Sequence, residues 1–197
     1  MREILRMIVV LAIITGVSGL LLAFVNQGTQ EQRKAQILKY VKGPAIHDVL
    51  SGSENEPLDD LLELKAGAGE EILTDIFPAY KEGKLWAVAF ESSGKGFGGD
   101  IGVIVGIDVT SDSLVGIGIT THKETPGLGS RVEESGFRIG FKGVSLGQPV
   151  KVQADGGGVD AVSGATISSR GVCEAVTQAA GFYQQNKEKI LAGLKND

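Results

Sequence analysis

The feature that most constrains this chain is an apolar run near its N-terminus, from residue 7 to residue 25. The run holds 19 residues without a formal charge. At 1.5 Å per residue, a helix of that length crosses a hydrocarbon core of ~30 Å. The run is longer than the apolar region of a signal peptide, and no A-x-A cleavage site precedes Asn26. We therefore predict an uncleaved transmembrane helix, with a signal peptide and a buried core helix as alternatives.

The rest of the chain is divided around this helix. Basic residues lie on both sides of the apolar run, so their distribution does not decide the orientation in the membrane. A helical stalk follows the run and is interrupted at the Gly43-Pro44 pair. The predicted parts are an N-terminal segment at 1–6, the transmembrane helix at 7–25, the stalk at 26–56 and a folded domain at 57–197.

Charge and residue counts exclude several classes of protein. A formal net charge of −5 offers no basic surface for a phosphate backbone, which disfavours nucleic-acid binding. The single cysteine, Cys173, forms no intramolecular disulfide, and with His47 and His122 it gives no metal-ligand spacing. We expect Cys173 to be a buried packing residue and His47 to be exposed or capping a helix. Nothing in the sequence indicates a Ser-His-Asp hydrolase.

The folded domain shows strand patterns in pairs, and helix patterns flank them, which predicts an α+β fold. The strands join into two antiparallel hairpins, and the last helix is the longest in the soluble part. The predicted elements are helices at 58–64, near 130–135 and at 167–194, and strands at 72–80, 85–91, 101–109, 114–121, 150–154 and 159–162.

Glycine is unusually frequent, with 29 residues, of which 21 lie in residues 94–197. This half of the chain therefore needs unusual backbone freedom or close approach of the backbone. The segment GKGFGG at 94–99 matches the G-x-G-x-x-G pattern of dinucleotide-binding proteins. That pattern binds a dinucleotide only where a helix follows it, and here the strand pattern at 101–109 follows. We interpret residues 94–99 as a turn between two strands.

Two further segments are candidate binding sites. The first, HKETPGLG at 122–129, presents a lone leucine between two glycines, and an ordinary Pro-Gly turn is an equally favoured interpretation. The second, DAVSGATISS at 160–169, leads into the last helix, whose free amides and positive dipole end attract anions. Capping by Ser163 or Thr166 would use only one hydroxyl. The four hydroxyls present indicate a phosphate, free or covalently held.

At these two segments the chain resembles the FMN-binding subunits of ion-translocating electron-transport complexes, the RnfG and NqrC family. The sequence SGATIS at 163–168 matches every position of the family's [ST]-G-A-T-x-[ST] motif, in which the threonine carries FMN through a phosphoester made by a flavin transferase. Asp160 completes the pattern that such transferases recognise. The sequence ETPGLG at 124–129 resembles the family's second signature, which lies against the flavin. The compact length resembles RnfG more than NqrC.

The resemblance assigns roles to individual residues. It implies that Thr166 is a phosphoryl threonine that carries covalent FMN. The phosphodiester keeps one negative charge, which suits a helix N-terminus. Leu128 would pack on the isoalloxazine ring, with Glu124 and Thr125 at its polar edge. The other residues implied to bind the cofactor are Gly129, Ser163, Gly164, Ala165, Ser168 and Ser169.

The resemblance also implies a function. The chain would be an electron-transfer subunit, not catalytic alone, of an inner-membrane complex that couples electron transfer of the ferredoxin/NAD type to Na⁺ or H⁺ translocation. Its partners would be the other membrane subunits of the Rnf-type complex and a flavin transferase. Residues 1–6 would be cytoplasmic and residues 57–197 an extracytoplasmic FMN-binding domain. The alternatives are an NqrC-type subunit of a Na⁺-pumping NADH:quinone oxidoreductase, and a periplasmic module that binds phosphate or flavin without a covalent bond.

Overall fold

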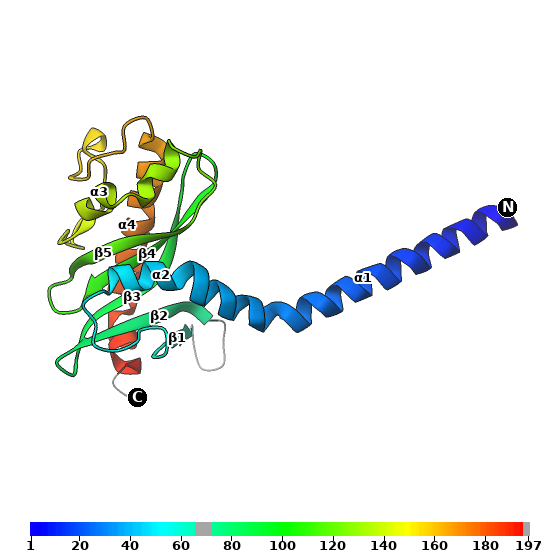
Figure 1. Ribbon diagram of the computed structural model, residues 1–197, viewed down its shortest axis with the longest axis horizontal. Coiled ribbons are helices and arrows are strands. Elements are labelled where there is room, and N and C mark those ends of the chain that lie inside the picture. Colours follow the sequence, from blue (N-terminus) through cyan, green and yellow to red (C-terminus); the bar gives the residue numbers. More distant parts are fainter. Residues whose placement is uncertain (66–71, 195–197) are drawn as a thin grey trace. The chain divides into compact units, whose positions relative to one another are not determined.

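The computed structural model describes residues 1–65 and 72–194, and the chain forms two compact units. The first unit, Met1–Lys39, is essentially one helix, α1 (Arg2–Ile37), shown in Figure 1. No residue of α1 is buried, so the core-helix alternative is wrong. The helical run that starts with α1 reaches a mean hydropathy of 2.8. Among the described residues it is the one helical run long and apolar enough to cross a membrane, and it fits a single-pass membrane protein.

The second unit, Tyr40–Asp197, includes the helix that follows α1. A π-helical segment, η1 (Leu38–Lys42), precedes α2 (Gly43–Val49). Pro44 lies in the first turn of α2, where its missing amide hydrogen needs no helical partner, so the Gly43-Pro44 pair begins a helix. Ile46 and Leu50 are fully buried. The predicted boundary at residue 56 therefore differs from the structure, in which α2 packs within the folded unit.

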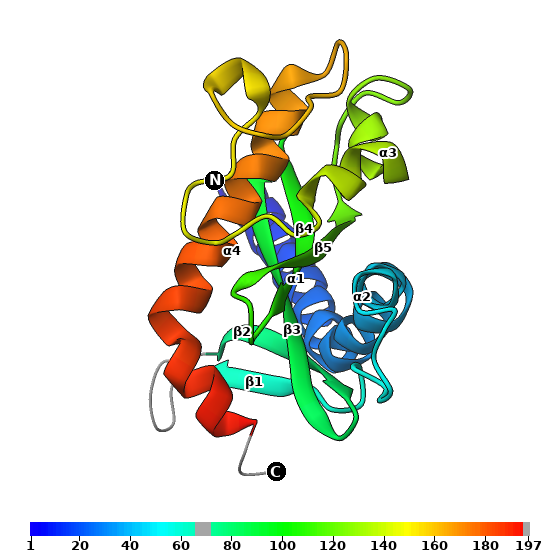
Figure 2. The ribbon, with the colours of Figure 1, turned by 90° about the vertical axis from the view of Figure 1, so that its left-hand side faces the viewer.

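Five strands form one antiparallel sheet in which each strand pairs with the next along the chain (Figure 2). Both predicted hairpins are confirmed. The first turns through Glu82 and Gly83 with φ angles of 52° and 68°, the left-handed conformation that matches the twist of a two-residue hairpin. The strands are β1 (Leu62–Lys65), β2 (Ile72–Lys81), β3 (Lys84–Lys95), β4 (Asp100–Asp108) and β5 (Ser113–Thr121).

The shorter predicted elements differ from the structure. The segment at 58–64 forms turns followed by β1, because pairing with β2 outweighs the helical spacing of its leucines. Val152 and Val159 form one isolated parallel bridge in place of two strands, since a short 3₁₀-helix, η4 (Gln153–Asp155), occupies the chain between them. The helix predicted near 130–135 is present as three short pieces, η2 (Gly129–Glu133), α3 (Ser135–Arg138) and η3 (Ile139–Phe141).

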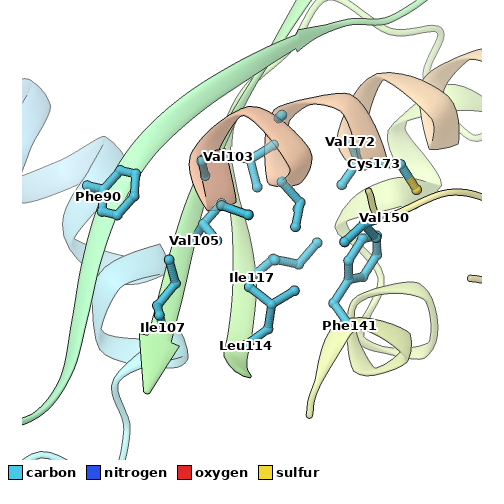
Figure 3. Close-up of a cluster of buried hydrophobic side chains, with 14 of the residues drawn as sticks. Phe90, Val103, Val105, Ile107, Leu114, Ile117, Phe141, Val150, Val172 and Cys173 are labelled. Carbon is cyan, nitrogen blue, oxygen red and sulfur yellow. The ribbon is translucent and has the colours of Figure 1, made fainter. Parts of the chain in front are cut away.

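The long C-terminal helix is confirmed as α4 (Thr166–Gly193), which packs against β3 and β4. Figure 3 shows the resulting core, in which Val103, Val105 and Ile107 of β4 lie on the side of α4. Alternate residues of a strand point to opposite faces, and a Cβ on Gly106 would lie 2.4 Å from Val49 of α2. The sheet is thus covered on both faces, which explains why residues 101–107 are all buried. The predicted α+β class is confirmed.

The backbones of β3 and α4 come into contact at two glycines. A Cβ on Gly94 would lie 2.0 Å from the carbonyl oxygen of Gly171, and a Cβ on Gly171 would lie 2.7 Å from that of Lys95. Neither position has room for a side chain. The contact brings the tip of the β3–β4 hairpin, residues 96–99, beside the start of α4. The interpretation of residues 94–99 as a turn between strands is confirmed.

Replacing Gly171 by alanine should lower the free energy of unfolding by about 1–3 kcal/mol, because the added methyl group forces α4 away from β3. Gly181→Ala in the same helix is the matched control, since nothing lies within 4 Å of its Cβ position. That variant should be neutral or more stable by up to about 1 kcal/mol, because alanine is the better helix former. Urea denaturation of the full chain in detergent measures both. Equal effects would contradict the contact.

Cys173 is the buried packing residue that the sequence predicts, with 3% of its surface exposed. Burial raises the pKa of its thiol to about 12, and the negative charge of Asp155 adds to the shift. Burial also raises the pKa of the Tyr183 phenol to about 12, again with a contribution from a carboxylate, that of Asp112. Both groups therefore stay neutral in the folded chain at a pH where the unfolded chain releases their protons.

The free energy of unfolding should consequently fall as the pH rises from about 9 toward 12. In an unfolded chain a cysteine ionises near pH ~8.5 and a tyrosine near pH ~10. Because the folded chain holds these protons up to a pH of about 12, the unfolded state loses them first and is favoured. Denaturation curves across this range measure the fall. In Cys173→Ala the part that begins near pH 9 should be absent, and an identical pH profile in that variant would contradict the assignment.

Candidate functional site

A cavity of about 320 Å³ opens where three segments of the second unit meet. The segments are the hairpin tip, the loop that follows β5 and the start of α4. The volume lies within the ~300–1,000 Å³ typical of small-molecule sites. The two segments that the sequence singles out as candidate sites thus face one space. The lining residues are Phe97, Glu124, Thr125, Leu128, Gly129, Gly164, Ala165, Thr166, Ile167 and Ser168.

Of the ten site residues expected from the sequence, eight line this cavity, and Ser163 and Ser169 do not. Ser163 is exposed in the loop before α4. Ser169 is fully buried, and its hydroxyl accepts a hydrogen bond from the Val162 amide at 2.9 Å and donates one to the Ala165 carbonyl at 3.0 Å. The Ser169 hydroxyl therefore holds the chain that leads into α4.

The polar end of the cavity is the first turn of α4. The N-cap residue is Ala165 and no side chain caps the helix, so the alternative of capping by Ser163 or Thr166 is wrong. The amides of the first helical turn consequently have no helical acceptor. Thr166 is the first residue of the helix and is partly exposed, and no residue that the structure describes bonds to its hydroxyl. An anion placed here would meet free amides and the positive end of a 28-residue helix.

The remaining walls of the cavity are apolar and exposed. Phe97 of the hairpin tip is 73% exposed, Leu128 of the loop 46% and Ile167 of α4 48%. Gly164 has a φ of +80°, which favours glycine, and its Cβ position lies 3.0 Å from Leu128, so the bare backbone lets that side chain lie close. A cluster of exposed apolar side chains beside free amides suits a ligand that combines an apolar ring with an anionic group.

Glu124 is the one carboxylate among the lining residues, and it is only 5% exposed. Its Oε1 atom accepts a hydrogen bond from the Gly98 amide at 2.7 Å, and its Oε2 atom accepts one from the Ser168 hydroxyl at 2.5 Å. The carboxylate thus connects the loop after β5 with the hairpin tip and with the first turn of α4. Both of its oxygens bond within the protein.

Two lining residues, Phe97 and Ile167, are not identified by the sequence reasoning. Phe97 lies inside the glycine-rich segment that we interpret from the sequence only as a turn. A large aromatic residue between glycines is a usable signal, because a turn exposes its side chain and offers it no core. Ile167 occupies the unspecified position of the SGATIS motif, so its residue type carries no signal.

The histidines lie outside this site. His47 is half exposed and lies 3.3 Å from the Glu56 carboxylate, as expected for an exposed residue of the first helical part. His122 donates or accepts at Glu133 through Nε2 at 2.8 Å, while its Nδ1 accepts from the Glu124 amide at 3.1 Å. Within residues 1–65 and 72–194, no group of three His, Cys, Asp or Glu side chains is placed to hold a metal ion.

Comparison with known proteins identifies similar sequences. Residues 96–181 match a family model described as an FMN-binding domain. A Pseudomonas aeruginosa protein, named as the RnfG subunit of an ion-translocating oxidoreductase complex, is 35% identical, over 97% of this chain and 94% of that protein. The protein of the same name from Shewanella oneidensis is 34% identical, over 87% of this chain and 85% of the relative.

Among solved structures, the fold is similar to that of NqrC from Shewanella oneidensis. The two have a TM-score of 0.52 and 28% sequence identity, and the match covers 63% of this chain and 62% of the other. The FMN-binding match includes the hairpin tip, the loop after β5 and the start of α4, so it contains all three walls of the cavity.

Replacing Ser169 by alanine should lower the free energy of unfolding by about 1–3 kcal/mol, because the Val162 amide then lacks its buried acceptor. Ser163→Ala is the control, since that side chain is exposed, and it should change the stability by less than about 0.5 kcal/mol. Thermal or urea denaturation of the full chain compares the two. A Ser169 variant as stable as the Ser163 variant would show that the hydroxyl does not hold this loop.

Proposed function

The chain belongs to the RnfG family of ion-translocating oxidoreductase complexes, and on this premise we propose that it carries FMN bound through a phosphoester to Thr166. It is an electron-transport subunit with an FMN-binding domain. The observation that carries the proposal is the position of the Thr166 hydroxyl. It lies at the first residue of α4, in the cavity, and bonds to no other described residue.

The cavity fits the two chemically different parts of FMN. The free amides of the first turn of α4 would receive the phosphate, whose remaining negative charge is stabilised by the helix dipole. Leu128, Ile167 and Phe97 would pack against the isoalloxazine ring. Thr125 is the polar side chain available at the edge of the ring. Ser169 is already bonded within the fold, so its contribution to the site is to hold the helix start in place.

FMN supplies one- and two-electron transfer when it is bound. The residues of this chain then have three tasks, which are to hold the phosphate, to cover the ring with apolar side chains and to leave one side open. The cavity does open to the surface, and Phe97 and Leu128 at its mouth are themselves exposed. An electron partner can therefore approach the bound ring without any opening of the fold. No acid, base or metal ligand is needed for this work.

The proposal extends to location and partners. The domain would lie on the extracytoplasmic side of the cell membrane, where FMN that dissociates is not readily replaced, and a covalent bond prevents that loss. The relatives are named as members of a multi-subunit complex, so the partners would be its other membrane subunits. Attachment requires a flavin transferase, and the complex would couple electron transfer to the movement of Na⁺ or H⁺. The likeness to NqrC favours, as second candidate, the same role in a Na⁺-pumping NADH:quinone oxidoreductase.

Thr166→Ala should abolish covalent flavin. The full chain is co-expressed with a flavin transferase, denatured and separated by gel electrophoresis, and flavin fluorescence is measured in the protein band. The wild-type band should fluoresce and the Thr166→Ala band should not, because the variant lacks the oxygen that forms the ester. Thr166→Ser keeps a hydroxyl at the same position and should retain fluorescence.

Two results would contradict the proposal. Fluorescence in Thr166→Ala equal to wild type would place the bond at another residue. A wild-type band without fluorescence, from protein that binds flavin before denaturation, would instead support the module that binds flavin without a covalent bond. Ser163→Ala serves as a second control, because its hydroxyl is exposed outside the cavity and its band should fluoresce like the wild type.

A further inference from the structure

Glu124 lies where the three walls of the cavity meet. Its side chain comes from the loop after β5, and its two carboxyl oxygens bond to the two other walls, at Gly98 of the hairpin tip and at Ser168 of α4. These partners are 26 and 44 residues away in the sequence. With 5% exposure, the carboxylate is nearly removed from water, where hydrogen bonds to a charged group are strongest.

We propose that Glu124 is a positioning residue that fixes the hairpin tip and the first turn of α4 relative to each other, and so sets the shape of the flavin cavity. The role differs from a polar contact at the edge of the ring, since the carboxylate oxygens already accept hydrogen bonds from the protein. Its consequence for the flavin rests on the proposed function. Its geometry does not, because every contact involved lies within the chain.

The backbone around Glu124 is built to admit this side chain. A Cβ on Gly96 would lie 2.5 Å from Oε1 of Glu124, and a Cβ on Gly129 would lie 2.6 Å from Oε2. Any side chain at either glycine would collide with the carboxylate. The tip and the loop therefore close around Glu124 on two sides, which leaves the carboxylate little freedom to turn toward the cavity.

The main chain of Glu124 is held as well. Its amide donates a hydrogen bond to Nδ1 of His122. Because an amide can only donate, this nitrogen of the imidazole carries no proton, and the proton of the neutral ring is on Nε2, which faces the Glu133 carboxylate. The side chain of Glu124 thus extends from a backbone that is itself fixed, as a rigid connection between the walls requires.

The consequence is for the parts that would hold the cofactor. Phe97 directly precedes Gly98, and Thr166 and Ile167 directly precede Ser168. Loss of the carboxylate would free the tip that carries Phe97 and leave the Gly98 amide without its acceptor. The ring would then lose a defined wall, although the phosphoester at Thr166 would remain chemically possible.

Hydrogen exchange of the hairpin tip tests the connection without any flavin. The full chain is produced without a flavin transferase, and exchange is followed by mass spectrometry in a peptide that covers residues 96–99. Glu124→Leu should speed exchange at the tip by about tenfold or more, because a bond to a charged acceptor is lost. Glu124→Gln should exchange close to wild type, since its carbonyl can accept from Gly98 and its amide can donate to Ser168. The β2–β3 turn, at the other end of β3, should exchange equally in all variants.

Ser168→Ala keeps the carboxylate and removes one of its two bonds, so exchange at the tip should rise several-fold, less than in Glu124→Leu. This variant carries the test if Glu124→Leu fails to fold. The positioning role is overturned if tip exchange is unchanged in Ser168→Ala and, where it folds, in Glu124→Leu. It is also overturned if Glu124→Gln exchanges as fast as Glu124→Leu, because the charge and not the pair of bonds would then matter.

Visible circular dichroism of the bound flavin tests the consequence in protein made with the transferase. The signal reports the asymmetry of the ring's surroundings, so it should weaken in Ser168→Ala and be retained in Glu124→Gln. The opposite pattern, a change in Glu124→Gln and none in Ser168→Ala, would make Glu124 a direct charge contact of the flavin and overturn the proposal. Failure of the FMN assignment itself would instead remove the flavin signal from the wild type and leave the exchange result untouched.

Discussion

The backbone contact between Gly94 and Gly171 is the constraint on which the candidate site depends. Because neither residue carries a side chain, β3 passes directly against α4, and the hairpin tip lies beside the first turn of the helix. The next strands, β4 and β5, then return the chain to the loop at 122–129. Three segments that are far apart in the sequence thus meet at one end of the sheet, and the cavity is the space between them.

The site combines two kinds of surface that folding normally removes. One is a helix start that no side chain caps, although hydroxyl-bearing residues surround it. The other is a set of exposed apolar side chains, among them Phe97 and Leu128. Each is unfavourable in water, and both are covered by one ligand that carries a phosphate at one end and a flat ring at the other. The requirement that a single molecule satisfy both surfaces is the physical argument for FMN.

Local patterns predicted the long elements, because a β-branched run or helical spacing over eight or more residues leaves one stable choice. They failed at 58–64, where a few leucines fit a helix but pairing with β2 decides the outcome. The resemblance placed Leu128 and Thr166 at one site, and both line the cavity. It could not show that the Ser169 hydroxyl points into the fold, since sequence spacing carries no direction for a side chain. Phe97 was missed because only the three-dimensional course of the hairpin puts a turn residue beside the helix.

The hairpin tip has an unusual evolutionary position for a surface turn. Ordinary hairpin loops gain and lose residues freely, because their ends stay paired whatever lies between. Here both ends are tied, at Gly94 by the helix and at Gly98 by the bond to Glu124. An insertion between them would shift the aromatic wall away from the pocket even if the sheet stayed intact. Length variation among relatives should therefore gather elsewhere in the domain, and this short turn should keep its residue count.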